Sequence, residues 1–166
     1  MRFKGLIALV FFLVAVSCTV KYSFTGASIS QDVKTYTIYD FVDRVRQNPN
    51  LSDYITEQLK DKFTRQTSLS YVNDGGNLEF EGTITGYNVK PISVQSGDVA
   101  AQNRLTVQVS VKFTNNKDHD QDFESSFSAY YDFDSENNLS DIEDTAVEEI
   151  VKQIISDVYN KSVANW

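Results

Sequence analysis

The sequence predicts an α+β fold, a two-layer sandwich in which two helices pack on one face of a mixed, mostly antiparallel sheet. The first observation is that two segments, Leu51–Phe63 and Ile142–Val158, repeat apolar residues at helical spacing. The second is that two other segments, Leu105–Phe113 and Phe123–Phe133, alternate apolar and polar residues, as strands with one buried face do. The third is the order of the elements, because a helix that follows strands and returns to strands crosses over the sheet.

The first eighteen residues resemble the signal peptide of a bacterial lipoprotein. Arg2 and Lys4 form a short cationic start, and the segment Gly5–Val16 is apolar without a break. About a dozen apolar residues are too few for a membrane span, which needs roughly twenty, but they fit the apolar region of a signal peptide. We therefore predict a signal peptide over residues 1–17 and one domain over residues 18–166.

Cys18 is the only cysteine in the chain, and the small residue Ser17 precedes it. This arrangement resembles the lipobox, in which the thiol receives a diacylglyceryl group, the peptide is cut before the cysteine and the new amine is acylated. The alternative is an ordinary signal peptide that ends near a cysteine, but an unpaired thiol is awkward in an oxidising compartment. Several acyl chains anchor a protein lastingly where one does not. Thr19, in place of an aspartate, implies by the same resemblance the periplasmic side of the outer membrane.

The net charge excludes one class of partner. The formal net charge of the whole chain is −8, and removal of residues 1–17, which contain two basic residues and no acidic one, changes it to −10. Nucleic-acid binding needs a basic footprint, so we expect no nucleic-acid partner. The same charge repels an anionic membrane surface, so lipid rather than electrostatic attraction is expected to hold the protein there. The many Phe and Tyr residues are typical of an ordered domain.

The N-terminal half is predicted to begin with two strands and a helix. Thr19–Phe24 alternates like a short strand and lies close to the anchor. Val33–Val42 is rich in β-branched and aromatic residues, and both of its faces carry apolar groups, so this strand is either buried on both sides or bent midway. A helix of about fifteen residues then begins after Pro49, at Leu51.

Glycines mark a predicted turn and a predicted bulge in the next part of the chain. Ser68–Val72 is predicted to be a strand, and Asp74–Asn77, which contains two glycines, is predicted to be the turn of a hairpin into the following strand. The alternation of that strand slips after Gly86, which predicts a β-bulge. Pro91 is expected to end the pairing, and a polar loop is expected over Ser93–Asn103.

The C-terminal half contains a second hairpin and the last helix. The two alternating segments described above are expected to pair antiparallel, with one buried apolar face and one polar face. Ser140 and Glu143, three residues apart, match the pattern of a capping box at the start of the last helix. The broad apolar face of this helix makes it the largest single apolar contributor to the predicted core.

No catalytic, metal-binding or cofactor-binding constellation is present in the sequence. His119 is the only histidine, and its loop, Asp118–Asp122, is rich in aspartate but lacks the glycine and the glutamate that an EF-hand requires. Asp132 and Asp134 share a face of one strand, which alone is weak evidence for acid–base chemistry. The sequence contains no glycine-rich phosphate loop, nucleophile elbow or metal-spaced cysteine set. We therefore expect a protein that is not an enzyme and needs no cofactor.

Several stretches together resemble the LptE family, the lipoprotein partner in the outer-membrane lipopolysaccharide translocon, in the version found in Bacteroidota. The resemblance covers nearly all of the chain after the signal peptide, and the order and spacing of the stretches behind the lipobox carry it. The stretches are Cys18 with Tyr22–Ile29, Val33–Ile38, Phe113–Asn115, Phe127–Phe133 and Val158–Trp166.

The resemblance implies two helices on a sheet and a function without catalysis. Such proteins plug the lumen of the LptD β-barrel, help it to assemble and help to pass lipopolysaccharide to the outer leaflet. A polar sheet face that carries aromatic residues suits the polar interior of a barrel. Lipopolysaccharide carries phosphates, so direct contact with it requires a local basic patch on this acidic protein.

Six residues are candidate contacts with the barrel or the glycolipid. Two are tyrosines and four are basic residues on or beside the central strands: Tyr36, Tyr130, Lys90, Arg104, Lys112 and Lys117. The alternative for these positions is that they are ordinary solvated strand residues.

Two other functions compete with this one. The main rival is an accessory lipoprotein of another envelope machine, such as an activator of peptidoglycan synthesis. Those proteins often carry a long disordered tether, whereas the first strand predicted here begins at Thr19. The second rival is a small periplasmic enzyme, against which the absence of an assembled catalytic site argues.

Overall fold

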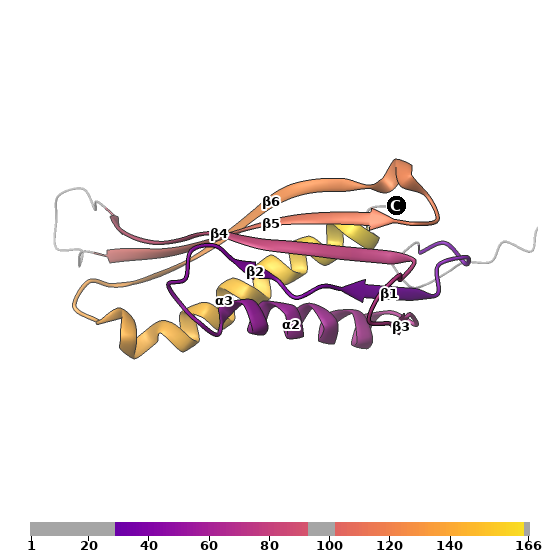
Figure 1. Ribbon diagram of the computed structural model, residues 1–166. Coiled ribbons are helices and arrows are strands. Elements are labelled where there is room, and N and C mark those ends of the chain that lie inside the picture. Colours follow the sequence, from indigo (N-terminus) through magenta and orange to yellow (C-terminus); the bar gives the residue numbers. More distant parts are fainter. Residues whose placement is uncertain (1–28, 93–101, 165–166) are drawn as a thin grey trace, which may run out of the picture.

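Two layers make up the part of the chain that the computed structural model describes, residues 29–92 and 102–164. A six-stranded sheet forms one layer, and the helices α2 (Leu51–Gln66) and α3 (Leu139–Tyr159) form the other, on one face of the sheet (Figure 1). The predicted α+β sandwich is confirmed. The strand predicted at Thr19–Phe24 lies outside the described residues. Neither described helix is both long and apolar enough to cross a membrane.

Three long antiparallel strands form most of the sheet. They are β4 (Leu78–Ile92), β5 (Gln102–Asn115) and β6 (Phe123–Asp134). β5 lies in the middle and pairs with β4 on one side and with β6 on the other. The predicted hairpin of β5 and β6 is therefore confirmed. The polar loop was expected over Ser93–Asn103, but β5 already begins at Gln102, where it pairs with both β4 and β6. The predicted loop therefore extends too far.

Short parallel strands extend the sheet on the β4 side. β1 (Thr35–Ile38) lies between β4 and β3 (Ser70–Tyr71) and runs parallel to both. The hairpin predicted from the turn at Asp74–Asn77 is wrong, because β1 is inserted between the two strands that this turn connects. The strand predicted at Ser68–Val72 exists, but only its middle pairs with β1.

The turn from β3 to β4 passes close to β1. The Thr37 hydroxyl accepts a hydrogen bond from the Gly76 N–H and donates one to the Val72 carbonyl, each at 3.0 Å. A Cβ atom on Gly76 would lie 2.6 Å from the Thr37 nitrogen, so a side chain has no room there. Gly75 has a φ of 68°, which glycine adopts at little cost. The two glycines therefore serve a turn that is shaped by β1 and not by direct pairing of β3 with β4.

The extended segment predicted at Val33–Val42 is bent midway. β1 occupies its first half, and a second short strand, β2 (Val42–Asp43), pairs parallel with β4 further along the same edge. Between them the Phe41 N–H leaves the sheet and donates to the Thr56 hydroxyl of α2 at 3.0 Å. The Phe41 side chain turns into the core, where its ring occupies the space left by the missing side chain of Gly82.

β4 contains a bulge and a proline. Its register with β5 shifts between Ile84 and Gly86, as the slip in the sequence pattern predicted. Pro91 does not end the pairing, because it lies opposite Asn103 and the ladder continues for one more residue. β1 and β2 pair with β4 only as far as Ile84, so within the described residues this end of β4 is an edge. A proline is tolerated there because no neighbouring strand requires its N–H.

The start of α3 is held by long-range contacts and not by the capping box predicted from Ser140 and Glu143. Asn138 occupies the N-cap position, and no side-chain hydrogen bond caps the helix there. Glu143 instead accepts hydrogen bonds from the Tyr87 hydroxyl of β4 and from Asn48 Nδ2, the latter at 3.1 Å. Burial, together with the hydrogen bond to Glu143, raises the pKa of the Tyr87 hydroxyl. These contacts connect α3 to the bulged part of β4 and to the loop before α2.

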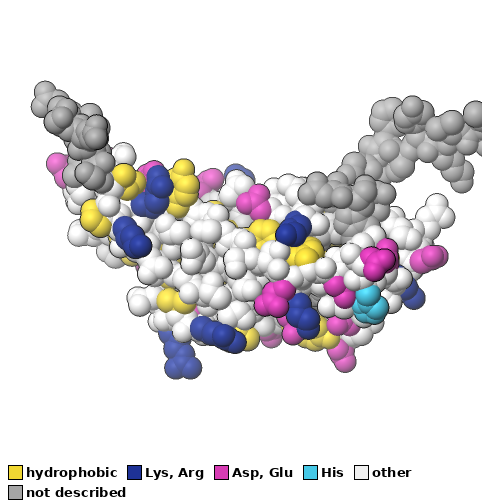
Figure 2. All heavy atoms as spheres, turned by 90° about the horizontal axis from the view of Figure 1, so that it is seen from above, with side chains coloured by type: hydrophobic (Ala, Val, Ile, Leu, Met, Phe, Trp, Pro, Cys, Tyr) yellow, Lys and Arg dark blue, Asp and Glu magenta, His cyan; other side chains and the backbone are white. Residues whose placement is uncertain are grey.

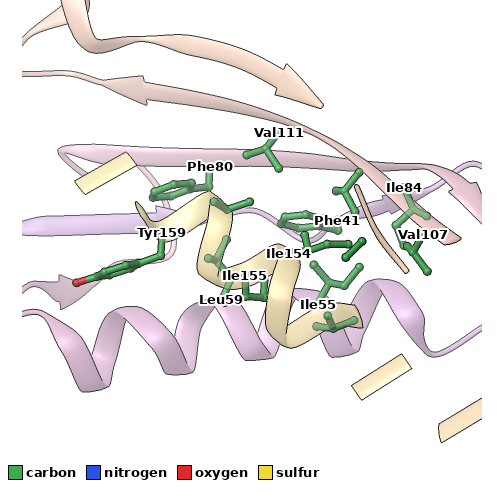
Figure 3. Close-up of a cluster of buried hydrophobic side chains, with 14 of the residues drawn as sticks. Phe41, Ile55, Leu59, Phe80, Ile84, Val107, Val111, Ile154, Ile155 and Tyr159 are labelled. Carbon is green, nitrogen blue, oxygen red and sulfur yellow. The ribbon is translucent and has the colours of Figure 1, made fainter. Parts of the chain in front are cut away.

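The core lies between the sheet and the two helices. In Figure 3, Phe80 and Val111 on the sheet lie opposite Leu59 of α2 and Ile154 of α3, and all four side chains are buried. A series of aromatic rings crosses the core, with successive ring centroids 4.9 to 5.2 Å apart. Its members are, in order, Tyr36, Phe63, Phe80, Phe113 and Phe123.

Candidate functional site

The face of the sheet that points away from the helices is polar, and no described helix covers it. Strand geometry produces this face, because alternate residues point into the core and the residues between them point outward. We call this surface the polar sheet face. It comprises Glu79, Glu81, Thr83, Asn88 and Lys90 on β4, Arg104, Thr106, Gln108, Ser110, Lys112 and Thr114 on β5, and Glu124, Ser126, Ser128, Tyr130, Asp132 and Asp134 on β6.

Charged groups gather toward the two ends of the polar sheet face. Figure 2 views the molecule from this side and shows Lys and Arg side chains near one end, a mixture of acidic and basic side chains toward the other, and mostly uncharged surface between them. The uncharged stretch corresponds to Thr106, Gln108 and Ser110 of β5 and their partners on β6. The two ends can therefore be considered as separate sites.

Four residues from three strands form a cluster at one end, which we call the Arg104 cluster: Lys90, Arg104, Tyr130 and Asp132. The register places Arg104 between Lys90 and Asp132. The guanidinium donates two hydrogen bonds to the Asp132 carboxylate, 2.6 Å from Nε and 2.7 Å from Nη2, and its Cζ lies 3.7 Å from the centroid of the Tyr130 ring. The hydrogen bonding between them raises the pKa of Arg104 and lowers the pKa of Asp132.

At the other end, Lys112 lies between two carboxylates. It faces Glu81 on β4 and Glu124 on β6, and its Nζ donates to Glu81 Oε1 at 2.6 Å. The hydrogen bond to Glu81 raises the pKa of Lys112. Lys117 follows β5 in the exposed turn before the short 3₁₀ helix η1 (His119–Gln121).

The four candidate basic residues do not gather in one patch. Arg104 and Lys112 lie eight positions apart on β5, which corresponds to about 27 Å at the usual strand rise. Lys90 is the neighbour of Arg104, whereas Lys117 lies beyond Lys112. Within the described parts of the chain, Lys90 and Lys117 have no ion-pair partner, and the other two are each paired with a carboxylate.

Tyr36 does not belong to the polar sheet face, so the predicted contact at this residue is wrong for the described structure. Its side chain is 1% exposed. Its hydroxyl donates to the Lys60 carbonyl at 3.3 Å and lies 2.9 Å from Thr64 Oγ1, both on α2. The physical reason is that β1 lies inside the sheet beneath this helix. Tyr130, by contrast, is 58% exposed.

Three carboxylates that lie beside the candidate basic residues in the sheet were not predicted as contacts. They are Glu81 and Glu124 beside Lys112, and Asp132 beside Arg104. The signal that identifies them is the cross-strand register, which the alternation of each single strand does not contain. A groove of about 400 Å³ adjoins the Glu81 side of the face. It is lined by Tyr39, Asp40, Val42, Glu79, Glu81, Gly82 and Thr83.

The aspartate-rich loop between β5 and β6 closes a hairpin. His119 Nδ1 lies 2.9 Å from Asp122 Oδ2, and the other oxygen of this carboxylate accepts a hydrogen bond from the Asn115 N–H at 2.7 Å. Within residues 29–92 and 102–164, no group of three or more His, Cys, Asp or Glu side chains could hold a metal ion. The polar sheet face is the candidate functional site because its hydroxyl, amide and charged side chains form a long surface that no described helix covers.

The Arg104–Asp132 ion pair predicts a pH dependence of stability. Because the folded protein lowers the pKa of Asp132, the stabilisation is present above the unfolded pKa of about 3.9 and is lost as the pH falls through the folded pKa. We expect Asp132→Asn to have a slightly lower free energy of unfolding than wild type at about pH 6. At about pH 2 the two free energies of unfolding should be equal. Urea unfolding at both pH values measures this difference.

Asp134→Asn is the matched control for this prediction. The Asp134 side chain lies on the same strand and the same face as Asp132 but has no ion pair within the described residues. It should change the free energy of unfolding less than Asp132→Asn does at the higher pH. An Asp132→Asn difference that is equal at the two pH values would contradict the prediction.

Comparison with known proteins gives one family and one fold. The family model described as LptE, lipopolysaccharide-assembly, matches residues 33–162. No curated protein matches the chain. A solved structure of a hypothetical protein from Chlamydia trachomatis has a TM-score of 0.54 at 9% identity, over 80% of this chain and 99% of that one. A protein from Xanthomonas campestris has a TM-score of 0.50 at 9% identity, over 77% of this chain and 84% of that one. At such identities these two similarities show the fold alone.

Proposed function

Because the chain belongs to the LptE lipopolysaccharide-assembly family, we propose that it is a non-catalytic outer-membrane lipoprotein that plugs an LptD-type β-barrel and helps it to assemble. In this role it assists the transport of lipopolysaccharide to the outer leaflet. The matched residues, 33–162, include both described α-helices and all six described strands. The proposal therefore concerns the folded domain as a whole.

The observation that carries the proposal is the uncovered polar sheet face. A long surface of hydroxyl, amide and paired charged groups is what an element needs if it lies against the polar interior of a barrel. The length of the face agrees with this position. β5 contains 14 residues, which corresponds to about 45 Å at the usual rise, close to the full thickness of a bilayer with its headgroups.

Co-purification tests the proposed partner. The chain is tagged after Trp166, the outer membrane is extracted in mild detergent, and the proteins that co-purify in stoichiometric amount are identified. A large β-barrel of the LptD type is the expected result. A peptidoglycan synthase in its place, or no stoichiometric partner, would contradict the proposed function while leaving the fold unaffected.

Cys18 is proposed to carry the lipid anchor. We expect Cys18→Ser to abolish the incorporation of labelled palmitate and to remove the protein from the mature outer-membrane pool, because no thiol remains to accept the diacylglyceryl group. Metabolic labelling followed by separation of the two membranes on a density gradient measures both effects. Ser17→Ala, which keeps a small residue before the cysteine, is the control and should be labelled like wild type. Palmitate on the Cys18→Ser protein would exclude the proposed anchor.

Contact with lipopolysaccharide itself is a separate part of the proposal. Its phosphates would be met first by Lys117, because this candidate cation lies outside the Arg104 cluster and has no carboxylate partner within the described residues. The plug role does not depend on this contact.

A further inference from the structure

We infer that the Arg104 cluster is an anchor for protein contact, with Tyr130 as the residue that touches the partner, and that its arginine is not a phosphate site. The inference rests on the proposed function, because the partner surface is taken to be the inner wall of the barrel. It goes further by assigning one end of the polar sheet face to that wall and by stating the chemistry of the contact.

One of the two donor edges that an arginine can offer to a phosphate is already in use at Arg104. Nε and Nη2 of Arg104 donate to the two oxygens of Asp132 at 2.6 and 2.7 Å, which is a bidentate pair. Arginine binds phosphate through a planar pair of donors of this kind. A phosphate at Arg104 would therefore have to displace the Asp132 carboxylate or accept a position beside its negative charge.

The charge around the cluster also argues against an anionic ligand. Arg104 and Lys90 are balanced by Asp132 and by Asp134, which lies one row further along the same face of β6. Over the whole polar sheet face as defined above, five carboxylates stand against three basic residues. Such a surface complements a partner that is uncharged and polar, or that carries basic groups.

Tyr130 has the properties of a residue that binds a protein surface. Its ring is held on one side by the guanidinium of Arg104, 3.7 Å from the ring centroid, yet 58% of the residue is exposed. An ordered, exposed ring loses little conformational freedom on binding, and Tyr and Arg are enriched at the energetic centres of interfaces. Asn88 and Thr106, in the same cross-strand row, add uncharged hydrogen-bonding groups beside it.

The test is a competition for the barrel inside the cell. Full-length, lipidated wild type and a variant are expressed together with distinguishable tags, the LptD-type barrel is purified through a tag of its own, and the ratio of the two lipoproteins in the complex is measured. We expect Tyr130→Ala to be under-represented by about tenfold or more, because loss of an aromatic anchor typically costs that much affinity. Tyr130→Phe keeps the ring over Arg104 and should stay within about threefold of wild type.

Two controls separate partner contact from folding and from glycolipid binding. Val89→Ala removes another exposed apolar side chain, which is 42% exposed on β4 but lies on the face of the sheet opposite to the polar sheet face, and should compete equally with wild type. Binding of purified lipopolysaccharide to the purified lipoprotein should be unchanged by Tyr130→Ala. The thermal unfolding midpoint of Tyr130→Ala should match that of wild type, since the ring lies outside the core.

Two results would overturn the inference. One is equal occupancy of the barrel by Tyr130→Ala and wild type. The other is a loss of lipopolysaccharide binding in Tyr130→Ala as large as that in Lys117→Ala, a substitution outside the cluster, which would make the cluster a glycolipid site. Absence of the wild-type lipoprotein from the purified barrel would be a different result. It would contradict the proposed function, whatever the variants do.

Discussion

Replacement of Phe63 by alanine is expected to lower the free energy of unfolding by about 3–5 kcal/mol. Phe63 lies on α2 and is 0% exposed. Its ring centroid lies 4.9 Å from that of Phe80 on β4, 5.2 Å from that of Tyr36 on β1 and 5.2 Å from that of Tyr159 on α3. Because these neighbours belong to three different elements, the cavity left by alanine cannot close through the movement of one side chain. Urea unfolding followed by circular dichroism measures the loss.

The control for this substitution is Arg65→Ala, two positions further along the same helix. Arg65 is exposed and forms a surface ion pair with Asp61 at 2.7 Å, so its removal should cost no more than about 0.5 kcal/mol. Phe63→Leu, which fills part of the cavity, should fall between the two. Equal stabilities of the Phe63→Ala and Arg65→Ala proteins would show that Phe63 does not hold the layers together.

Gly82→Ala is the second substitution with a large expected effect, a loss of about 1–3 kcal/mol. An added Cβ atom would lie 2.1 Å from Cε1 of the Phe41 ring, far inside contact distance. The ring cannot easily retreat, because it is 5% exposed within the core and the Phe41 N–H is bonded to Thr56 of α2. Denaturant unfolding of the single variant measures the cost of this overlap.

A double variant identifies the Phe41 ring as the obstacle. In Phe41→Leu, Gly82→Ala the smaller side chain leaves room for the new methyl group, so the pair should cost less than the sum of the two single substitutions. Thr83→Ala, the neighbouring residue on the polar sheet face, is the matched control and should have a small effect. Additive costs in the double variant would mean that the strain lies elsewhere in β4.

The parts of the fold that were predicted from the sequence are those whose pattern is local. α2 begins at Leu51 as predicted, and α3 presents the expected apolar face, because repeats at helical spacing directly encode which side of a helix is buried. The pairing of β5 with β6 followed from two alternating segments joined by a short loop. The bulge near Gly86 followed from a slip in the alternation.

The errors concern contacts between residues far apart in the chain. β1 is inserted between β3 and β4, and nothing in the turn at Asp74–Asn77 distinguishes a hairpin from a turn that passes a third strand. Glu143 lies three residues after Ser140 but bonds to Tyr87, 56 positions away in sequence. A local pattern of residue types can serve either a local or a distant partner, and the tertiary structure decides which.

The prediction of the candidate site was also limited to what local patterns reveal. Tyr130 and Arg104 were predicted as contacts from their residue types and strand positions, and both lie on the polar sheet face. That Arg104 is paired with Asp132 and stacked on Tyr130 depends on the register of β5 against β6, which aligns the three side chains. Tyr36 was misplaced because single-strand alternation does not reveal which face a helix covers.

The position of β1 also determines how the domain bears mechanical load. The chain enters the described fold just before this strand, which is bonded to β3 on one edge and to β4 on the other. Tension applied from the N-terminal side along β1 would therefore shear its backbone hydrogen bonds with β3 and with β4 at the same time, so that both rows oppose the force together. A strand at the rim of the sheet would instead peel away one bond at a time. A protein pulled by its N-terminal end thus transmits the force into a strand that is hydrogen-bonded on both sides.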